Sequence, residues 1–265
     1  MTVRIGTSGW QYRDWRGTFY PAGLPQSRWL EHYASRFATV EVNNTFYRLP
    51  PASTFQKWHD GTPADFEITL KASRYLTHVR RLRDPQEPVK LLLERAEPLG
   101  EKLGPILLQL PPNLPADPAA LSETLDAFRR STRVSARIKL ALEPRHPSWF
   151  VDEIYDILRA RDAALCLTDR RSRPGVVVRT ASWFYLRFHE GNASPHPCYG
   201  RQALASWARR LLTLWDRDAD GYVYFNNDGR ACAPRDAARF ARACAKVGFH
   251  AARAADPREC RLASS

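Results

Sequence analysis

The stretch Ile138-Lys139-Leu140-Ala141-Leu142-Glu143-Pro144-Arg145-His146 has the pattern of a strand that ends in a charged loop. Its large apolar side chains, one Ile and two Leu, fall on one parity, while Lys139 and Glu143 fall on the other. Strand side chains alternate between the two faces of a sheet. A helix-like run begins near Asp152, and strand-loop-helix units are typical of parallel sheets whose apolar face is covered by helices. The charged face is therefore expected to point into an interior or a crevice.

Seven further segments share this strand-like pattern, and helical periodicity separates most of them. With the first, the expected strands are Val3–Gly6, Thr39–Asn43, Phe66–Lys71, Pro105–Gln109, Ile138–Glu143, Ala164–Asp169, Phe184–His189 and Tyr222–Asn226. This alternation predicts an α/β fold of the (β/α)₈ TIM-barrel type, with an irregular sixth βα connection because Arg170–Ser182 lacks a helical period. The alternative is an open doubly wound sheet. Its dinucleotide-binding form is disfavoured because no GxGxxG motif follows the first strand.

The polar parity of these strands predicts a barrel with a polar interior. Positions such as Arg4, Glu67 and Lys139 lie deep in the expected barrel, and we expect them to form buried, structural ion pairs. On that basis Lys139→Ala should cost about 3–5 kcal/mol. We expect a single domain over residues 1–248 and a C-terminal tail over 249–265.

Composition narrows the class of protein. The net charge is +12 with a pI near 9.8, which allows a polyanionic partner such as nucleic acid. The basic residues are dispersed, however, and this favours an arginine-rich solvated surface. The five cysteines are odd in number and include no CxxC pair, which predicts a reduced, cytoplasmic protein without a disulfide framework. No apolar stretch approaches the length of a membrane span, so no membrane partner is expected.

The carboxyl ends of the expected strands carry most of the groups capable of chemistry, and active sites of barrels lie at that face. As catalytic residues we predict Lys71, Glu143, His189 and Asp169. As substrate-binding residues we predict Trp10, Glu41, Asn43, Tyr47, His78, Gln109, Arg145, His146, Arg187, Asn226 and Asn227. No metal or other cofactor is predicted.

Motifs along the chain resemble those of the YecE-like TIM-barrel family, long catalogued as a domain of unknown function. The matching pieces are Gly6-Thr-Ser-Gly-Trp10, Phe19-Tyr-Pro21, Val40-Glu-Val-Asn43, Thr45-Phe-Tyr47, Lys71-Ala72, Thr77-His78, Leu103-Gly-Pro105, Gln109-Leu-Pro-Pro112, Glu143-Pro-Arg-His146-Pro-Ser-Trp149, Arg187-Phe-His189 and Tyr224-Phe-Asn-Asn-Asp228. The resemblance implies the barrel and a polar pocket at its C-terminal mouth, without supplying a reaction. The chain departs from the family pattern at His189-Glu190-Gly191-Asn192, where the family has His-Gly-Arg, at Asp236-Ala237 and at Cys232.

Three functions remain open at this stage. In the first, a metal-free enzyme with hydrolase or isomerase-like chemistry acts on a small anionic or polyhydroxylated substrate. Glu143 is then the acid or base, Lys71 lowers its pKa or stabilises negative charge, and His189 and His78 shuttle protons. In the second, Glu41, Glu143, Asp169 and a histidine hold a divalent metal. The third is a non-enzymatic barrel that binds nucleic acid or protein.

Overall fold

The computed structural model describes residues 2–130, 138–169 and 177–262. Its strands form two all-parallel sheets. One has the order β1-β9-β8-β7 and contains β1 (Val3–Thr7), β9 (Gly221–Phe225), β8 (Phe184–Phe188) and β7 (Leu167–Thr168). The other follows the chain and contains β2 (Thr39–Val42), β3 (Glu67–Lys71), β4 (Leu103–Gln109), β5 (Leu140–Glu143) and β6 (Ala164–Leu165).

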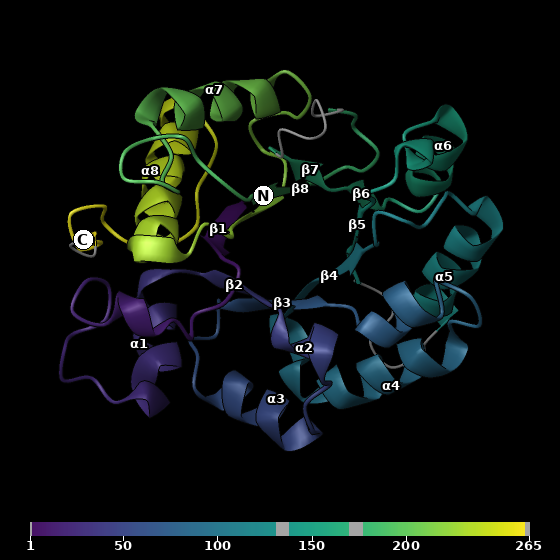
Figure 1. Cartoon of the computed structure of the whole chain (residues 1–265), viewed down its shortest axis with the longest axis horizontal. Coiled ribbons are helices and arrows are strands. Elements are labelled where there is room, and N and C mark those ends of the chain that lie inside the picture. Colours follow the sequence, from purple (N-terminus) through teal and green to yellow (C-terminus); the bar gives the residue numbers. More distant parts are fainter. Residues whose placement is uncertain (1, 131–137, 170–176, 263–265) are drawn as a thin grey trace.

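Helices lie around the strands, which occupy the middle of Figure 1. They are α1 (Trp29–Arg36), α2 (Asn44–Tyr47), α3 (Ala52–Asp60), α4 (Gln86–Ala96), α5 (Pro118–Arg130), α6 (Asp152–Arg159), α7 (Arg201–Leu212) and α8 (Cys232–Lys246). A π-helical turn, η3 (Tyr75–Val79), follows β3. Short 3₁₀ turns account for η1 (Arg13–Trp15), η2 (Gln26–Arg28), η4 (Glu97–Lys102), η6 (Pro147–Trp149) and η7 (Gly229–Ala231). Within the described ranges, no helix combines the length and apolarity needed to cross a bilayer.

The prediction of a closed eight-stranded barrel is wrong, because the strands of the described residues pair as two separate sheets. One break falls inside the expected strand Ala164–Asp169. Its first half, β6, pairs with β5, and its second half, β7, pairs with β8. The side-chain hydroxyl of Thr180 accepts the backbone N–H of Leu165 at 2.7 Å, so a loop side chain takes a place that a strand would otherwise hold.

The other break lies between β1 and β2. The hydroxyl of Tyr33, from α1, accepts the N–H of Thr7 at 2.9 Å and donates to the carbonyl of Thr39 at 3.1 Å. A side chain thus satisfies backbone groups on both edge strands, as buried backbone groups require. Gly6 permits this close approach, since a Cβ there would lie 2.2 Å from the Thr39 carbonyl oxygen.

Polar and aromatic side chains of one parity meet between the two sheets. The hydroxyl of Tyr224 on β9 lies 2.7 Å from the Thr39 hydroxyl and 2.6 Å from that of Thr69. Large apolar residues of the opposite parity, such as Val223 and Leu70, belong to the main core beneath the helices. The fold therefore delivers a polar set of side chains to the space between the sheets.

Two further predictions concern the connections and the tail. Of the sixth βα connection, residues 170–176 lie outside the described residues, and residues 177–182 contain no helix. Near the C-terminus, Ala251 forms a bridge with Val3, and Arg253 pairs with Asp65 at 2.6 Å. The division into a domain over 1–248 and a tail over 249–265 stays a prediction.

Candidate functional site

A buried ion cluster lies where the carboxyl ends of the two sheets face each other. Arg187 on β8 donates from Nη2 to Oε1 of Glu41 on β2 at 2.8 Å. From Nη1 it donates to Oε2 of Glu143 on β5 at 2.5 Å. The side chains of Glu41, Arg187 and Glu143 are 0–2% exposed. One guanidinium therefore holds two carboxylates that come from the other sheet.

Glu41 has further partners within this cluster. The hydroxyl of Ser8, directly after β1, donates to Oε1 at 2.7 Å, and the hydroxyl of Tyr185 donates to Oε2 at 2.5 Å. With Arg187 these bonds occupy both carboxylate oxygens of Glu41. We interpret Glu41 as a fixed anion that holds Arg187 in place.

Glu143 has looser partners on its second oxygen. Gln109 donates to Oε2 at 2.8 Å, whereas Arg145 Nε and His189 Nε2 each lie 3.7 Å from Oε1. Burial would raise the pKa of Glu143, but the charges of Arg187, His189 and Arg145 outweigh it and hold the pKa at about 2. Glu143 is therefore ionised at neutral pH. Its Oε1 faces Arg145 and His189, each at 3.7 Å.

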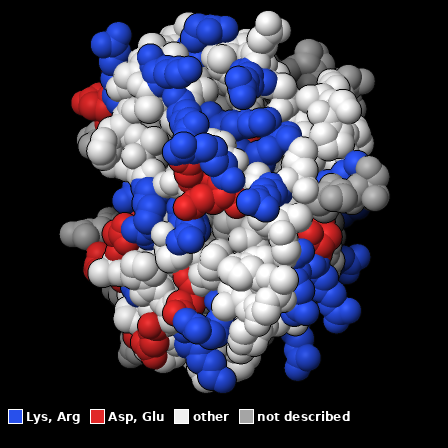
Figure 2. Space-filling view, turned by 90° about the vertical axis from the view of Figure 1, so that its left-hand side faces the viewer, with Lys and Arg blue, Asp and Glu red and all other residues white. Residues whose placement is uncertain are grey.

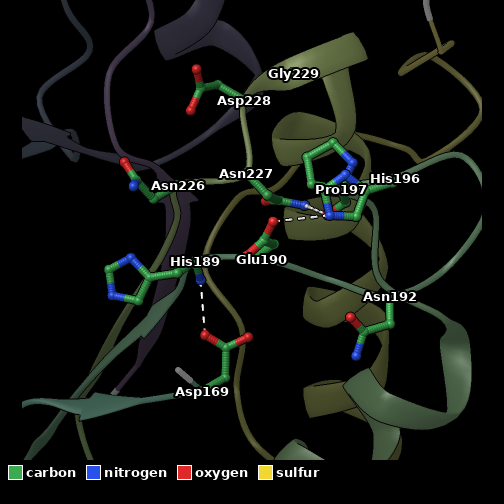
Figure 3. A pocket seen from close by; sticks show the side chains of 10 residues that line it. All are labelled: Asp169, His189, Glu190, Asn192, His196, Pro197, Asn226, Asn227, Asp228 and Gly229. Atoms are coloured by element: carbon green, nitrogen blue, oxygen red, sulfur yellow. Dashed lines mark hydrogen bonds and ion pairs between the residues drawn. The ribbon is translucent and has the colours of Figure 1, made fainter. Parts of the chain in front are cut away.

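His189 also forms part of the wall of a cavity of about 710 Å³ (Figure 3). The cavity is lined by Asp169, His189, Glu190, Asn192, His196, Pro197, Asn226, Asn227, Asp228 and Gly229. The backbone N–H of His189 donates to Asp169 Oδ1 at 2.9 Å, and the Tyr199 hydroxyl donates to the other oxygen of Asp169. Asp169 thus fixes the strand end that carries His189, and the hollow beside it is polar.

One wall of this cavity is the loop that leads from β8 to α7, and a disulfide ties it to α8. Cys198 in the loop is bonded to Cys232, the first residue of α8. The expectation of a chain without disulfides is therefore wrong for this pair, while Cys166, Cys244 and Cys260 are buried and take part in no disulfide. The separation of 34 residues between these two cysteines matches no spacing from which a disulfide could be predicted. They meet only because the loop folds back over the start of α8.

Lys71 and His78 lie beside the cluster. The Lys71 ammonium lies 4.1 Å from the centre of the Phe46 ring, and that ring contacts the imidazole of His78 edge-on at 4.9 Å. Burial lowers the pKa of Lys71 to about 8, with the charge of Arg187 adding to the effect. Burial, followed by the charge of Lys71, lowers the pKa of His78 to about 4. Arg187, rather than Lys71, supplies the main charge that depresses the pKa of Glu143.

Other predicted site residues lie apart from this cluster or serve the scaffold. Trp10 packs edge-on against Trp58 at 5.6 Å and lines a separate hollow between α1 and α3. Tyr47 is 78% exposed and lines a third hollow. His146 Nδ1 lies 2.8 Å from the Ser148 hydroxyl at the start of η6.

The predicted amides divide between scaffold and cavity. Asn43 Nδ2 donates weakly, at 3.4 Å, to the Ser8 carbonyl. Asn227 donates to Asp236 at 2.9 Å and is 2% exposed, while Asn226 lines the cavity. The functional role of every predicted site residue stays a prediction, since geometry alone assigns no reaction.

Several cavity and cluster residues were not predicted. Tyr185 precedes Arg187 by two residues and shares its parity, so a stricter use of strand alternation finds it. The side chain of His196 lies in the loop over 190–200, where it pairs with Glu190 at 3.0 Å. That loop has no periodicity from which its position follows.

The metal-binding alternative finds no preformed ligand set. In residues 2–130, 138–169 and 177–262, no group of three or more His, Cys, Asp or Glu side chains is arranged to hold a metal ion. Arg187 occupies the position between Glu41 and Glu143, two of the ligands that the alternative requires.

The basic composition is visible on the surface. Figure 2 shows Lys and Arg gathered on the face toward α8 and the C-terminal segment, with acidic side chains between them. There Arg242 and Arg258 both pair with Asp256, at 2.8 and 2.7 Å, and Arg36 pairs with Glu259 at 3.2 Å. Binding of nucleic acid, an alternative that the dispersed charge of the sequence disfavours, remains untested.

The fold and the cluster together define an α/β protein with two parallel sheets and a buried carboxylate-guanidinium site at their carboxyl ends. The chain belongs to the family described as "Protein of unknown function DUF72", whose model matches residues 4–259. The YecE-like resemblance of the motifs is thereby confirmed.

Relatives and solved structures agree with this assignment. The chain is 26% identical to UPF0759 protein YunF of Bacillus subtilis over 257 residues, covering 85% of this chain and 89% of YunF. It is 30% identical to UPF0759 protein YecE of Escherichia coli over 149 residues, covering 56% of this chain and 50% of YecE. The crystal structure of a DUF72 family protein from Thermotoga maritima is 30% identical, with a TM-score of 0.75 over 91% of this chain and 98% of that one. A DUF72 family protein from Enterococcus faecalis, 20% identical with a TM-score of 0.74 over 92% and 96% of the two chains, shows the same fold.

Proposed function

We propose that the chain is an acid/base enzyme that acts on a small anionic or polyhydroxylated substrate in the cavity beside His189. One observation carries the proposal. The Nε2 atom of His189 lies 3.7 Å from a buried, ionised carboxylate oxygen of Glu143, and the same histidine lines a polar cavity of about 710 Å³. A histidine within ion-pair distance of a carboxylate, at the edge of a cavity, is an arrangement from which general acid/base catalysis can operate once the groups close to hydrogen-bond distance.

Proton transfer is assigned to His189 rather than to Glu143. With a pKa held at about 2, Glu143 retains its charge through the physiological range and has no proton to donate. Its negative charge instead stabilises the imidazolium that forms when His189 accepts a proton from water or from a substrate hydroxyl. Hydrolysis is the simplest reaction of this kind, and an isomerisation that moves one proton uses the same groups.

Substrate class is proposed from the groups around the cavity. Arg145, a quarter exposed and 3.7 Å from Glu143 Oε1, supplies a cation beside the ion cluster, and the side-chain amide of Asn226 in the cavity wall supplies donors and an acceptor. Cations and amides of this kind bind phosphate, carboxylate and sugar hydroxyl groups. We propose no cofactor, and a cytoplasmic location.

A pair of histidine variants tests the proposal, because two histidines line the same cavity in different ways. His189 is almost buried against Glu143, whereas the side chain of His196 is 64% exposed. We expect His189→Asn to lose about 10²–10⁴-fold of turnover, with His196→Asn close to the native rate. Turnover is followed by NMR against a panel of sugar phosphates, lactones and hydroxy acids. Native turnover by His189→Asn on a substrate that the native protein converts would reject this role.

A further inference from the structure

Lys71 differs from the other lysines of the chain. Only six of the 40 basic residues are lysine, namely Lys57, Lys71, Lys90, Lys102, Lys139 and Lys246. Lys102 donates to the carbonyls of His59 and Thr62, Lys139 pairs with Asp220, and the remaining three are exposed. Lys71 is 8% exposed, and toward the described residues its Nζ makes neither a hydrogen bond nor an ion pair. A buried amine without an oxygen partner is costly in free energy unless it has another use.

The surroundings of this amine favour its neutral form. Its Nζ lies over the Phe46 ring, which offers an attractive but weak contact for a cation. Burial and the positive charges of Arg187 and Arg145 lower the pKa of Lys71 to about 8, against the opposing charges of Glu41 and Glu143. His78, the remaining titratable neighbour, is neutral at pH 7 and adds no charge. A desolvated lysine beside other cations is the usual form of an activated amine nucleophile.

The Phe46 side chain, over whose ring the amine lies, also lines a hollow of about 630 Å³ together with Thr45, Tyr47 and Ser73. The amine is therefore separated from an open hollow by the ring on which it lies.

We propose that Lys71 forms a covalent imine with a small carbonyl compound, an aldehyde or a ketone, bound at the ion cluster. The neutral Nζ attacks the carbonyl carbon, and the electron pair of the C=O bond moves to oxygen, which takes up a proton. The carbinolamine hydroxyl then takes up a proton from solvent and leaves as water, while the nitrogen lone pair forms the C=N bond and the nitrogen returns its two original protons to solvent. The balance is one amine and one carbonyl giving one imine and one water, so no oxidant or reductant is needed.

This inference rests on the proposed function in one respect, that a small polar substrate reaches the cluster. It narrows the substrate class to anionic or hydroxylated carbonyl compounds. It does not depend on His189, because imine formation is scored without any turnover.

Reductive trapping on the native protein tests the proposal. The protein is incubated at pH 8 with glyoxylate or with glycolaldehyde and sodium cyanoborohydride, digested, and each lysine peptide is quantified by mass spectrometry. At pH 8 a pKa of about 8 leaves about half of Lys71 neutral, against roughly 0.3% for a lysine at the ordinary value of 10.5. Lower basicity partly offsets this advantage, so we expect Lys71 to be alkylated about tenfold faster than Lys57 and Lys90. These exposed lysines are references within the same molecule, so the comparison needs no variant to fold. Labelling of Lys71 no faster than Lys57 and Lys90 with both probes would overturn the proposal.

Two variants separate this proposal from the acid/base function. His189→Asn is expected to keep the rapid labelling of Lys71 even where it has lost turnover. Lys71→Arg keeps the positive charge and should lose the fast-labelled site, leaving the rates at Lys57 and Lys90 unchanged. Slow labelling of Lys71 in a protein whose turnover still requires His189 would reject the imine and leave the acid/base proposal standing.

Discussion

Two layers of ion pairs lie between the sheets, and they differ in how much water they meet. In the upper layer, at the carboxyl ends of the strands, the side chains of Glu41, Arg187 and Glu143 are 0–2% exposed. In the lower layer, Arg4 pairs with Glu67 at 2.6 Å and Lys139 with Asp220 at 2.9 Å, with side chains 18–30% exposed. The layers use similar residue types on the same parity. Depth along a strand therefore does not decide which layer is dry.

The exposure of the lower layer is opposite to the expectation drawn from the sequence, which placed Arg4, Glu67 and Lys139 in buried ion pairs. In the upper layer the Ser8 and Tyr185 hydroxyls and the Gln109 amide close around the carboxylates. The lower layer instead opens toward the amino ends of the strands, where the hydroxyl of Tyr222 donates to Glu67 at 2.6 Å. Because removing one partner costs most where water cannot replace it, the two layers should respond differently to the same substitution.

The largest effect is expected for Arg187→Met. The variant leaves Glu41 and Glu143 buried without the cation that lies between them, which should lower the free energy of unfolding by about 3–5 kcal/mol. Arg4→Met is the matched control in the lower layer, and we expect a loss of about 1 kcal/mol or less. Denaturant unfolding of both variants measures the difference. Equal losses would show that the two layers are energetically alike.

Lowering the pH tests the contribution of Glu143 to the stability of the upper layer. Its folded pKa of about 2 lies below the ordinary value of 4.5, so its contribution is fully present above pH 4.5 and is lost as the pH falls toward 2. The shift corresponds to about 3 kcal/mol, and the buried carboxyl group needs no correction for solvent. We therefore expect the unfolding free energy of the native protein to fall across this window more steeply than that of Glu143→Gln. Parallel curves for the two proteins would mean that Glu143 contributes nothing specific.

Much of the fold follows from alternation of side chains in the sequence. The strand positions and the polar parity depend on local pattern, and Arg187, Glu41 and Glu143 meet in the structure because each occupies a polar position at a strand end. Closure of the strands into a barrel depends instead on contacts between segments that are far apart in the sequence. It fails where Tyr33 and Thr180 insert hydroxyl groups at the strand edges, and neither insertion has a periodic signal.

The candidate site was predictable to a similar extent. Strand residues could be placed by parity, whereas the loop that carries His196 and the bond between Cys198 and Cys232 depend on tertiary contacts. Trp10 and Tyr47 were assigned to the site because they follow strand ends, but the chain turns away after β1 and β2 and carries them to other hollows. Site residues on a strand can therefore be placed from the sequence, and the placement becomes less accurate for residues further along the chain from the end of that strand.

The smallest effect is expected for Lys139→Ala. The sequence alone placed this lysine in a dry interior, where its loss would cost about 3–5 kcal/mol. Its side chain is instead 30% exposed, and that of Asp220 is 28% exposed, so water can hydrate the carboxylate once the ammonium is removed. We expect a loss of about 1 kcal/mol, as for a partly exposed ion pair. Lys139→Met, which retains the methylene chain beside Trp183 and Tyr222, separates the charge from the packing. A loss of about 3 kcal/mol or more for both variants would show that removing a charge costs as much in the lower layer as in the upper one. The proposed difference between the two layers would then be wrong.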